Sequence, residues 1–202
     1  MKNLFSKKNL IWLGLLIVFF FLFQFLIDVR IITPYYRTVL YGIGIFIILG
    51  VSLNIIIGIT GQLSLGHAGF MSIGAYSAAI VMQNMPDMTG LLLGMVVGAV
   101  VSILVSFVVA IPTLRLKGDY LAIATLGVGE IIRIVILNLE ITNGASGISN
   151  IKNLISWPLL FVFVVGAVIL SANFKNSAIG RACISIKEDE IASEAMGIHT
   201  TK

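Results

Sequence analysis

Segment 61–69 holds the polar residues best suited to handling a solute, and it interrupts two strongly apolar stretches. Lipid offers no hydrogen bonds to a backbone that has left a helix, so such a break is stable only where protein or a water-filled cavity surrounds it. In transporters, broken membrane helices mark the substrate path. We therefore predict that the translocation path includes the glycines and polar residues of this segment, which are Gly61, Gln62, Ser64, Gly66, His67 and Gly69.

A lone histidine such as His67 could sense pH or bind a metal ion. A hydrogen-bonded structural role is the better interpretation, because no cluster of cysteines and histidines has the spacing of metal ligands. Cys183 is the single cysteine, and we interpret it as a small packing residue. The sequence therefore predicts no metal site and no cofactor.

Two opposite charges, Glu130 and Arg133, lie inside a later apolar stretch. They are three residues apart, so they share one face of a helix. A charge near the bilayer centre costs about 2.5–3.5 kcal/mol on insertion scales, and such residues normally face a bundle interior or a cavity. The pair could line the translocation path or act as a latch between conformations. A structural pair is the favoured interpretation, since each side chain already supplies a partner for the other.

The residues after 172 are polar and have a helical pattern from Arg181 to Met196. Apolar residues recur there at helical spacing, and Gly197 can end the helix. An amphipathic helix of this kind could lie on lipid, but its acidic run Glu188-Asp189-Glu190 would be repelled by anionic headgroups. We therefore predict a helix that docks on another protein.

The elements that position these groups follow from the composition. The chain has 202 residues, of which 58% are hydrophobic and 11% charged, whereas a soluble domain carries roughly 25% charge. The apolar runs are continuous rather than alternating, which disfavours a β-barrel. The net charge of +4 forms no basic stripe, so nucleic-acid binding is not supported. We predict an all-α polytopic membrane protein in contact with lipid, with about six membrane helices, one of them broken or short, and a cytoplasmic docking helix.

The predicted membrane segments are 10–27, 38–59, 70–82, 91–111, 120–139 and 154–172. The third is only thirteen residues long, so it can cross only if the break supplies part of the span. Cationic residues gather on the cytoplasmic side of membrane proteins. An N-terminus in the cytoplasm puts Arg30, Arg37 and Lys152 outside, and it puts inside a larger set: Lys2, Lys7, Lys8, Arg115, Lys117, Lys175, Arg181, Lys187 and Lys202. We predict that orientation.

The motifs of several enzyme classes are absent from the sequence. No Gly-x-x-x-x-Gly-Lys-Ser/Thr phosphate loop occurs, so the chain is not expected to hydrolyse ATP itself. Ser64 lies in no Gly-x-Ser-x-Gly elbow, and no pairing of a nucleophile with a base is evident. We therefore predict that the chain is not an enzyme.

Three stretches resemble the LivM-type permeases of branched-chain amino acid ABC importers. They are residues 61–76, residues 115–133 with 142–149, and residues 179–198. The resemblance implies a bacterial inner-membrane subunit that pairs with a second, LivH-like permease. It also implies two cytoplasmic ATPase subunits and an extracytoplasmic substrate-binding protein. By the same resemblance, the ATPase-docking residues would be Glu188, Asp189, Glu190, Glu194, Ala195 and Gly197.

The resemblance has two departures. The family's docking pattern, Glu-Ala-Ala followed by a glycine three residues on, is matched only loosely by Glu194-Ala195-Met196-Gly197. Members of the family are also longer, so residues 1–172 are expected to form an incomplete transmembrane permease domain, followed by a cytoplasmic docking loop at 173–202. Importers of urea and short-chain amides are similar to this family, so the substrate stays open between these classes. A channel or scaffold subunit that does not couple to ATP is a further alternative.

Overall fold

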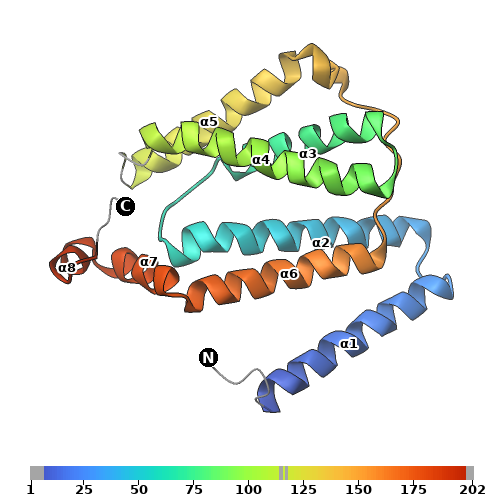
Figure 1. Ribbon diagram of the computed structural model, residues 1–202, viewed down its shortest axis with the longest axis horizontal. Coiled ribbons are helices and arrows are strands. Elements are labelled where there is room, and N and C mark those ends of the chain that lie inside the picture. Colours follow the sequence, from blue (N-terminus) through green and yellow to red (C-terminus); the bar gives the residue numbers. More distant parts are fainter. Residues whose placement is uncertain (1–6, 114–115, 117, 199–202) are drawn as a thin grey trace. The chain divides into compact units, whose positions relative to one another are not determined.

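The computed structural model describes residues 7–113, 116 and 118–198, and the described chain is helical without strands (Figure 1). Its α-helices are α1 (Lys7–Asp28), α2 (Pro34–Asn54), α3 (His67–Asn84), α4 (Met88–Thr113), α5 (Asp119–Asn138), α6 (Trp157–Asn176), α7 (Ala178–Glu188) and α8 (Glu190–Ala195). A π-helix, η1 (Ile55–Ile59), continues α2, and two 3₁₀ turns, η2 (Glu140–Thr142) and η3 (Gly144–Ser146), follow α5.

Long apolar helices dominate the described residues. Four of them are long and apolar enough to cross a membrane: Pro34–Ile59, Met88–Thr113, Asp119–Asn138 and Trp157–Asn176. A shorter apolar stretch, Gly14–Asp28, lies in α1. These findings confirm the predicted all-α polytopic membrane fold.

The third segment is longer than predicted. α3 has 18 residues rather than thirteen and begins at His67, inside the predicted break. At 1.5 Å per residue it is ~27 Å long, close to the ~30 Å thickness of the hydrocarbon core. Residues 67–69 of the break belong to the helix and so supply part of its length, as expected, although they were not predicted to be helical. Sequence reasoning missed this because glycine and histidine are poor helix formers.

The chain divides into two compact units. The first comprises residues 1–52 and 155–174, and it contains α1 and most of α2 and α6. Its buried side chains are Tyr41, Trp157 and Leu160, with aromatic residues of α1 packed around them. Gly44 of α2 accommodates Leu160 of α6, since a Cβ on Gly44 would lie 2.7 Å from Leu160 Cδ2. The Trp157 indole donates a hydrogen bond to the carbonyl of Phe20 in α1, at 3.3 Å.

The second unit comprises residues 53–154 and 175–202, and it contains η1, α3, α4, α5, α7 and α8. α3 and α4 run antiparallel and touch through small residues. A Cβ on Gly94 would lie 3.0 Å from Ala78 Cα, and a Cβ on Gly98 would lie 2.8 Å from the Gly74 carbonyl oxygen. The sequence motif Gly94-x-x-x-Gly98 is therefore a packing motif, as small residues at membrane helix interfaces usually are.

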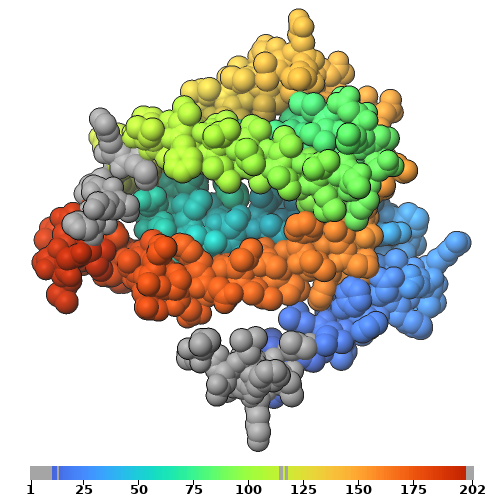
Figure 2. Space-filling model, viewed as in Figure 1, coloured from blue at the N-terminus to red at the C-terminus, as the bar shows by residue number. Residues whose placement is uncertain are grey.

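The outward-facing side chains of α4 are almost entirely apolar. Figure 2 shows this helix exposed along one face of its unit. Its most exposed large side chains include Val96, Leu104, Phe107, Val108 and Ile111. A water-facing surface of that kind would be a liability, whereas it is the normal exterior of a helix in lipid.

The orientation predicted from cationic residues stays a prediction. Lys2, Arg115, Lys117 and Lys202, four of the residues that it rests on, lie outside the described residues.

Replacing Gly98 by alanine should destabilise the α3–α4 interface. The new methyl group would meet backbone atoms of α3 that cannot rotate away, and overpacking of this kind costs roughly 1–3 kcal/mol. The thermal denaturation midpoint of the protein in detergent is expected to fall.

Gly166→Ala in α6 is the matched control, because a Cβ there meets nothing within 4 Å. Equal midpoints for Gly98→Ala and Gly166→Ala would contradict the close packing of α3 on α4.

Candidate functional site

The break begins where α2 widens into a π-helix. The Thr60 amide bonds to the Ile55 carbonyl at 3.2 Å, and the Gln62 amide reaches back to the Ile56 carbonyl at 3.2 Å. Each of these hydrogen bonds spans more residues than the four of an α-helix. π-helical turns of this kind often occur at functional sites. Gly61 then adopts φ +72°, a left-handed conformation that glycine takes without strain.

The other end of the break is fixed to the middle of α5. The Leu65 amide donates to Thr125 Oγ1 at 3.0 Å, and Gly66 packs against the carbonyl of Thr125. A Cβ on Gly129 would lie only 3.1 Å from Gly66 Cα. α3 therefore starts beside the centre of α5 and runs parallel to it, with Ile73 packed on Ile132 and Ile136.

A pocket of about 160 Å³ lies between the start of α3 and α5. It brings three of the predicted path residues together: Gly69, Glu130 and Arg133. The remaining described residues that line it are Leu65, Ala68, Ser72, Leu126 and Gly129. A hydroxyl and a charge of each sign thus face a small cavity beside a break in a membrane helix.

Glu130 and Arg133 form a two-pronged ion pair. Arg133 Nε donates to Glu130 Oε2 at 3.0 Å, and Arg133 Nη2 donates to Glu130 Oε1 at 2.5 Å. Their side chains are 52% and 59% exposed, respectively, so other parts of the described chain leave about half of each uncovered. The predicted proximity is confirmed, and the pair is open to a solute or a partner on its outer side.

The other predicted path residues do not belong to the described lining of this pocket. His67 is the first residue of α3 and is partly buried. Gln62 and Ser64 belong to the non-helical part of the break. Gly61 lies at its far end, where it contacts α7 instead.

The predicted docking helix is two helices. The single helix expected from Arg181 to Met196 starts at Ala178 and is broken at Asp189, whose φ is −156°. The Asp189 carboxylate accepts the Ala192 amide at 3.0 Å and so caps α8. Ser185 and Ser193 join the two helices by a hydroxyl–hydroxyl hydrogen bond of 2.7 Å. The sequence pattern missed the break because an aspartate suits a helix cap as well as an acidic helix surface.

The surface of α8 is open. Ile191 and Met196 are 82% and 84% exposed, beside Glu190 and Glu194. Gly197 ends α8 at φ +85°, as predicted for a C-terminal stop. Ala195 is exposed as well, and so is Glu188 at the end of α7. Protein interfaces commonly have an apolar centre with a polar rim, and the exposed Ile191 and Met196 bordered by carboxylates fit that pattern.

Sequence reasoning did not find Lys187, whose ammonium group donates to the Gly58 carbonyl at 3.0 Å. No pattern in the sequence could have found it, since 129 residues separate the two partners.

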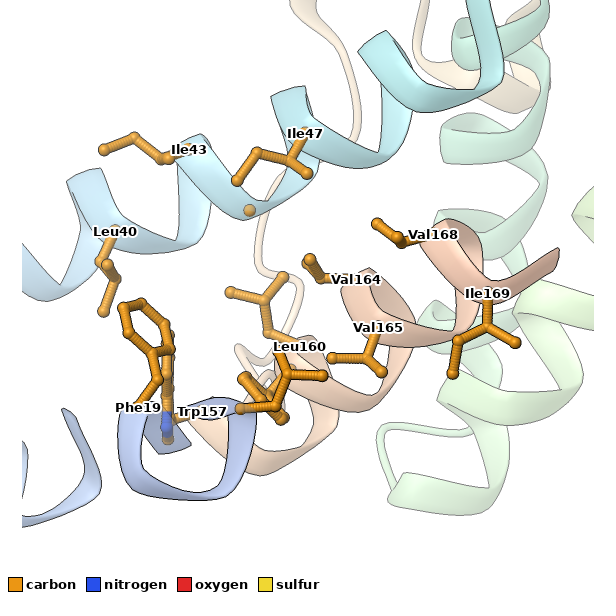
Figure 3. Close-up of a pocket in the computed structure, with 13 residues that line it drawn as sticks. Phe19, Leu40, Ile43, Ile47, Trp157, Leu160, Val164, Val165, Val168 and Ile169 are labelled. Carbon is orange, nitrogen blue, oxygen red and sulfur yellow. The ribbon is translucent and has the colours of Figure 1, made fainter. Parts of the chain in front are cut away.

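A larger cavity, of about 250 Å³, lies in the first unit between α1, α2 and α6. Leu40, Ile43 and Ile47 of α2 face Val164 and Val168 of α6 across it (Figure 3). Its described lining is apolar, and the Trp157 indole N–H is already bonded to Phe20. A charged or polar solute would find no partner there, and burying one would be costly. Its chemistry suits hydrocarbon.

Comparison with known proteins agrees with this architecture. Residues 35–202 match the family described as branched-chain amino acid transport system / permease component. The chain is similar to the high-affinity branched-chain amino acid transport system permease protein LivM of Salmonella typhimurium, with 35% identity over 47% of this chain and 31% of that protein. The LivM protein of Escherichia coli K12 is 35% identical over 45% of this chain and 30% of that protein.

The match thus spans about a third of the length of these curated relatives, and no solved structure matches the chain significantly. Because the family match covers most of the chain, including the break, the ion pair and helices α7 and α8, the chain is a multi-pass membrane protein that belongs to the permease component family of branched-chain amino acid transport systems.

Proposed function

We propose that this chain is a permease subunit of an ATP-binding-cassette importer for leucine, isoleucine and valine. The observation that carries the proposal is the family match over residues 35–202. The LivM relatives, whose printed names specify branched-chain amino acid transport, support the same substrate class.

The proposal includes the partners and the location that such an importer needs. A LivH-like second permease completes the translocation path, two ABC ATPase subunits bind in the cytoplasm, and an extracytoplasmic binding protein delivers the substrate. The chain lies in the bacterial inner membrane with its N-terminus in the cytoplasm. ATP is hydrolysed by the ATPase subunits and not by this chain.

The pocket between α3 and α5 is the proposed part of the translocation path. An amino acid zwitterion carries one charge of each sign, and Glu130 and Arg133 offer the two opposite charges about half exposed in that pocket. Charge-assisted hydrogen bonds are roughly twice as strong as neutral ones, so the pair can hold either end of a zwitterion weakly while it passes. The apolar cavity of the first unit has no such groups.

The break at Gly61–Gly66 is the proposed moving part. Different elements contact its two ends: the Lys187 side chain of α7 packs against Gly61, and Thr125 of α5 accepts a hydrogen bond from the Leu65 amide. α7 and α8 are the proposed ATPase-docking helices, with exposed Ile191 and Glu194 and the partly buried Glu190 as the contact surface. Closure of the ATPase dimer would then be transmitted through α7 to the break and the pocket.

Uptake of labelled leucine by the importer, reconstituted with its partner subunits in proteoliposomes, tests the proposed function. We expect uptake that requires ATP, that excess valine blocks and that excess urea leaves unchanged. Uptake of urea instead of leucine would overturn the substrate class. Leucine flux that persists without ATP would favour an uncoupled channel.

Neutralising both members of the ion pair separates a path role from a purely structural one. Glu130→Gln or Arg133→Gln alone should lower the amount of folded permease, because each leaves an unpaired charge in a span, at about 2.5–3.5 kcal/mol. The double variant Glu130→Gln/Arg133→Gln should restore the amount of folded permease. Its leucine uptake should nevertheless stay at roughly a tenth of wild type or less, because a tenfold fall in rate corresponds to losing about 1.4 kcal/mol of transition-state stabilisation.

Uptake and folded amount are measured on the same membranes. A double variant that transports leucine at the wild-type rate would show that the pair is structural only.

A further inference from the structure

The inference concerns the contact between α7 and the break, and it rests on the proposed function. Lys187 lies in the last turn of α7, and its Nζ donates to the carbonyl oxygen of Gly58 at 3.0 Å. Gly58 belongs to η1, which ends at Ile59, so its carbonyl is among the last of that helix and lacks the donors that further turns would supply. The carbonyl end of a helix also carries a partial negative charge, which suits an ammonium group.

The stem of Lys187 packs against the first residue of the break. A Cβ on Gly61 would lie 2.5 Å from Lys187 Cγ and 3.2 Å from Lys187 Cβ. Gly61 also has φ +72°, which a side chain would strain. Both the left-handed backbone and the neighbouring Lys187 stem therefore require glycine at position 61. The second of these constraints exists only because Lys187 packs against Gly61.

Lys187 thus contacts the start of the break in two ways: its ammonium group bonds to Gly58, and its aliphatic stem packs against Gly61. α7 and α8 are themselves joined by the Ser185–Ser193 hydrogen bond, so a force on α8 reaches α7. From Gly61 the chain needs only four more residues to reach Leu65, which α5 holds through Thr125. Glu130 and Arg133 lie on the next turns of α5.

We propose that Lys187 is the positioning residue that couples the docking helices to the break, by holding Gly58 and Gly61 to α7. When the docking helices move with the ATPases, Lys187 moves the start of the break with them, while Thr125 holds its end on α5. The broken segment thus changes its path beside the pocket in step with the ATP cycle.

The test compares ATP hydrolysis with leucine uptake in the reconstituted importer. Lys187→Met keeps much of the apolar stem and removes the ammonium group. We expect wild-type assembly and nearly wild-type ATPase activity, but a fall of about fivefold or more in leucine transported per ATP, which is the lower end of typical coupling between sites. Lys187→Arg keeps the charge and should recover most of the loss.

Lys175→Met is the matched control, since Lys175 is an exposed lysine at the end of α6, and it should behave as wild type. Unchanged transport per ATP in Lys187→Met would overturn the inference. So would a parallel loss of uptake, ATPase activity and assembled complex, because that pattern indicates a structural role alone. If the wild-type importer does not move leucine with ATP, the proposed function is overturned instead. The wild-type sample therefore separates failure of the proposed function from failure of the inference about Lys187.

Discussion

The backbone leaves its helix after Ile59 and joins the next one at His67, so the hydrogen-bonding groups of this stretch and the last carbonyls of η1 must be satisfied by protein. Three contacts meet part of this demand. Gln62 bonds back to the π-turn, Leu65 bonds to Thr125 on α5, and the Gly58 carbonyl is bonded by Lys187 on α7. Because the partners lie on different helices, the same contacts that stabilise the break also connect α7 with α5.

Close helix packing follows from the break. Gly66 and Gly69 pack against Gly129 of α5, at distances that leave no room for a side chain. α3 is held on its other side by the small residues that face α4. A helix that starts inside the unit is thereby fixed by backbone contact on two sides, and the pocket with Glu130 and Arg133 lies where its first turn meets α5.

Much of this arrangement could be predicted from sequence, because it depends on local pattern. Apolar length predicted the four long helices that can cross a membrane, and three-residue spacing predicted the Glu130–Arg133 pair. Local pattern also misled where one residue type has two uses. Asp189 looked like part of an acidic helix surface and is a helix cap, while His67 and Gly69 looked like loop and are helical. Contacts between distant segments, such as Lys187 with Gly58 and Leu65 with Thr125, have no local signal at all.

The central claim is that the break moves with α7 and against α5 during the ATP cycle. Pulsed electron paramagnetic resonance can measure both distances in the assembled importer, with Cys183 replaced by serine so that only introduced cysteines carry spin labels. One pair joins Leu63 in the break to Ile179 on α7, and the other joins Leu63 to Ile134 on α5, all three being exposed sites. The account predicts that ATP, added with hydrolysis-deficient ATPase subunits, shifts the Leu63–Ile134 distance and leaves the Leu63–Ile179 distance unchanged. A fixed Leu63–Ile134 distance, or a break that separates from α7, would contradict it.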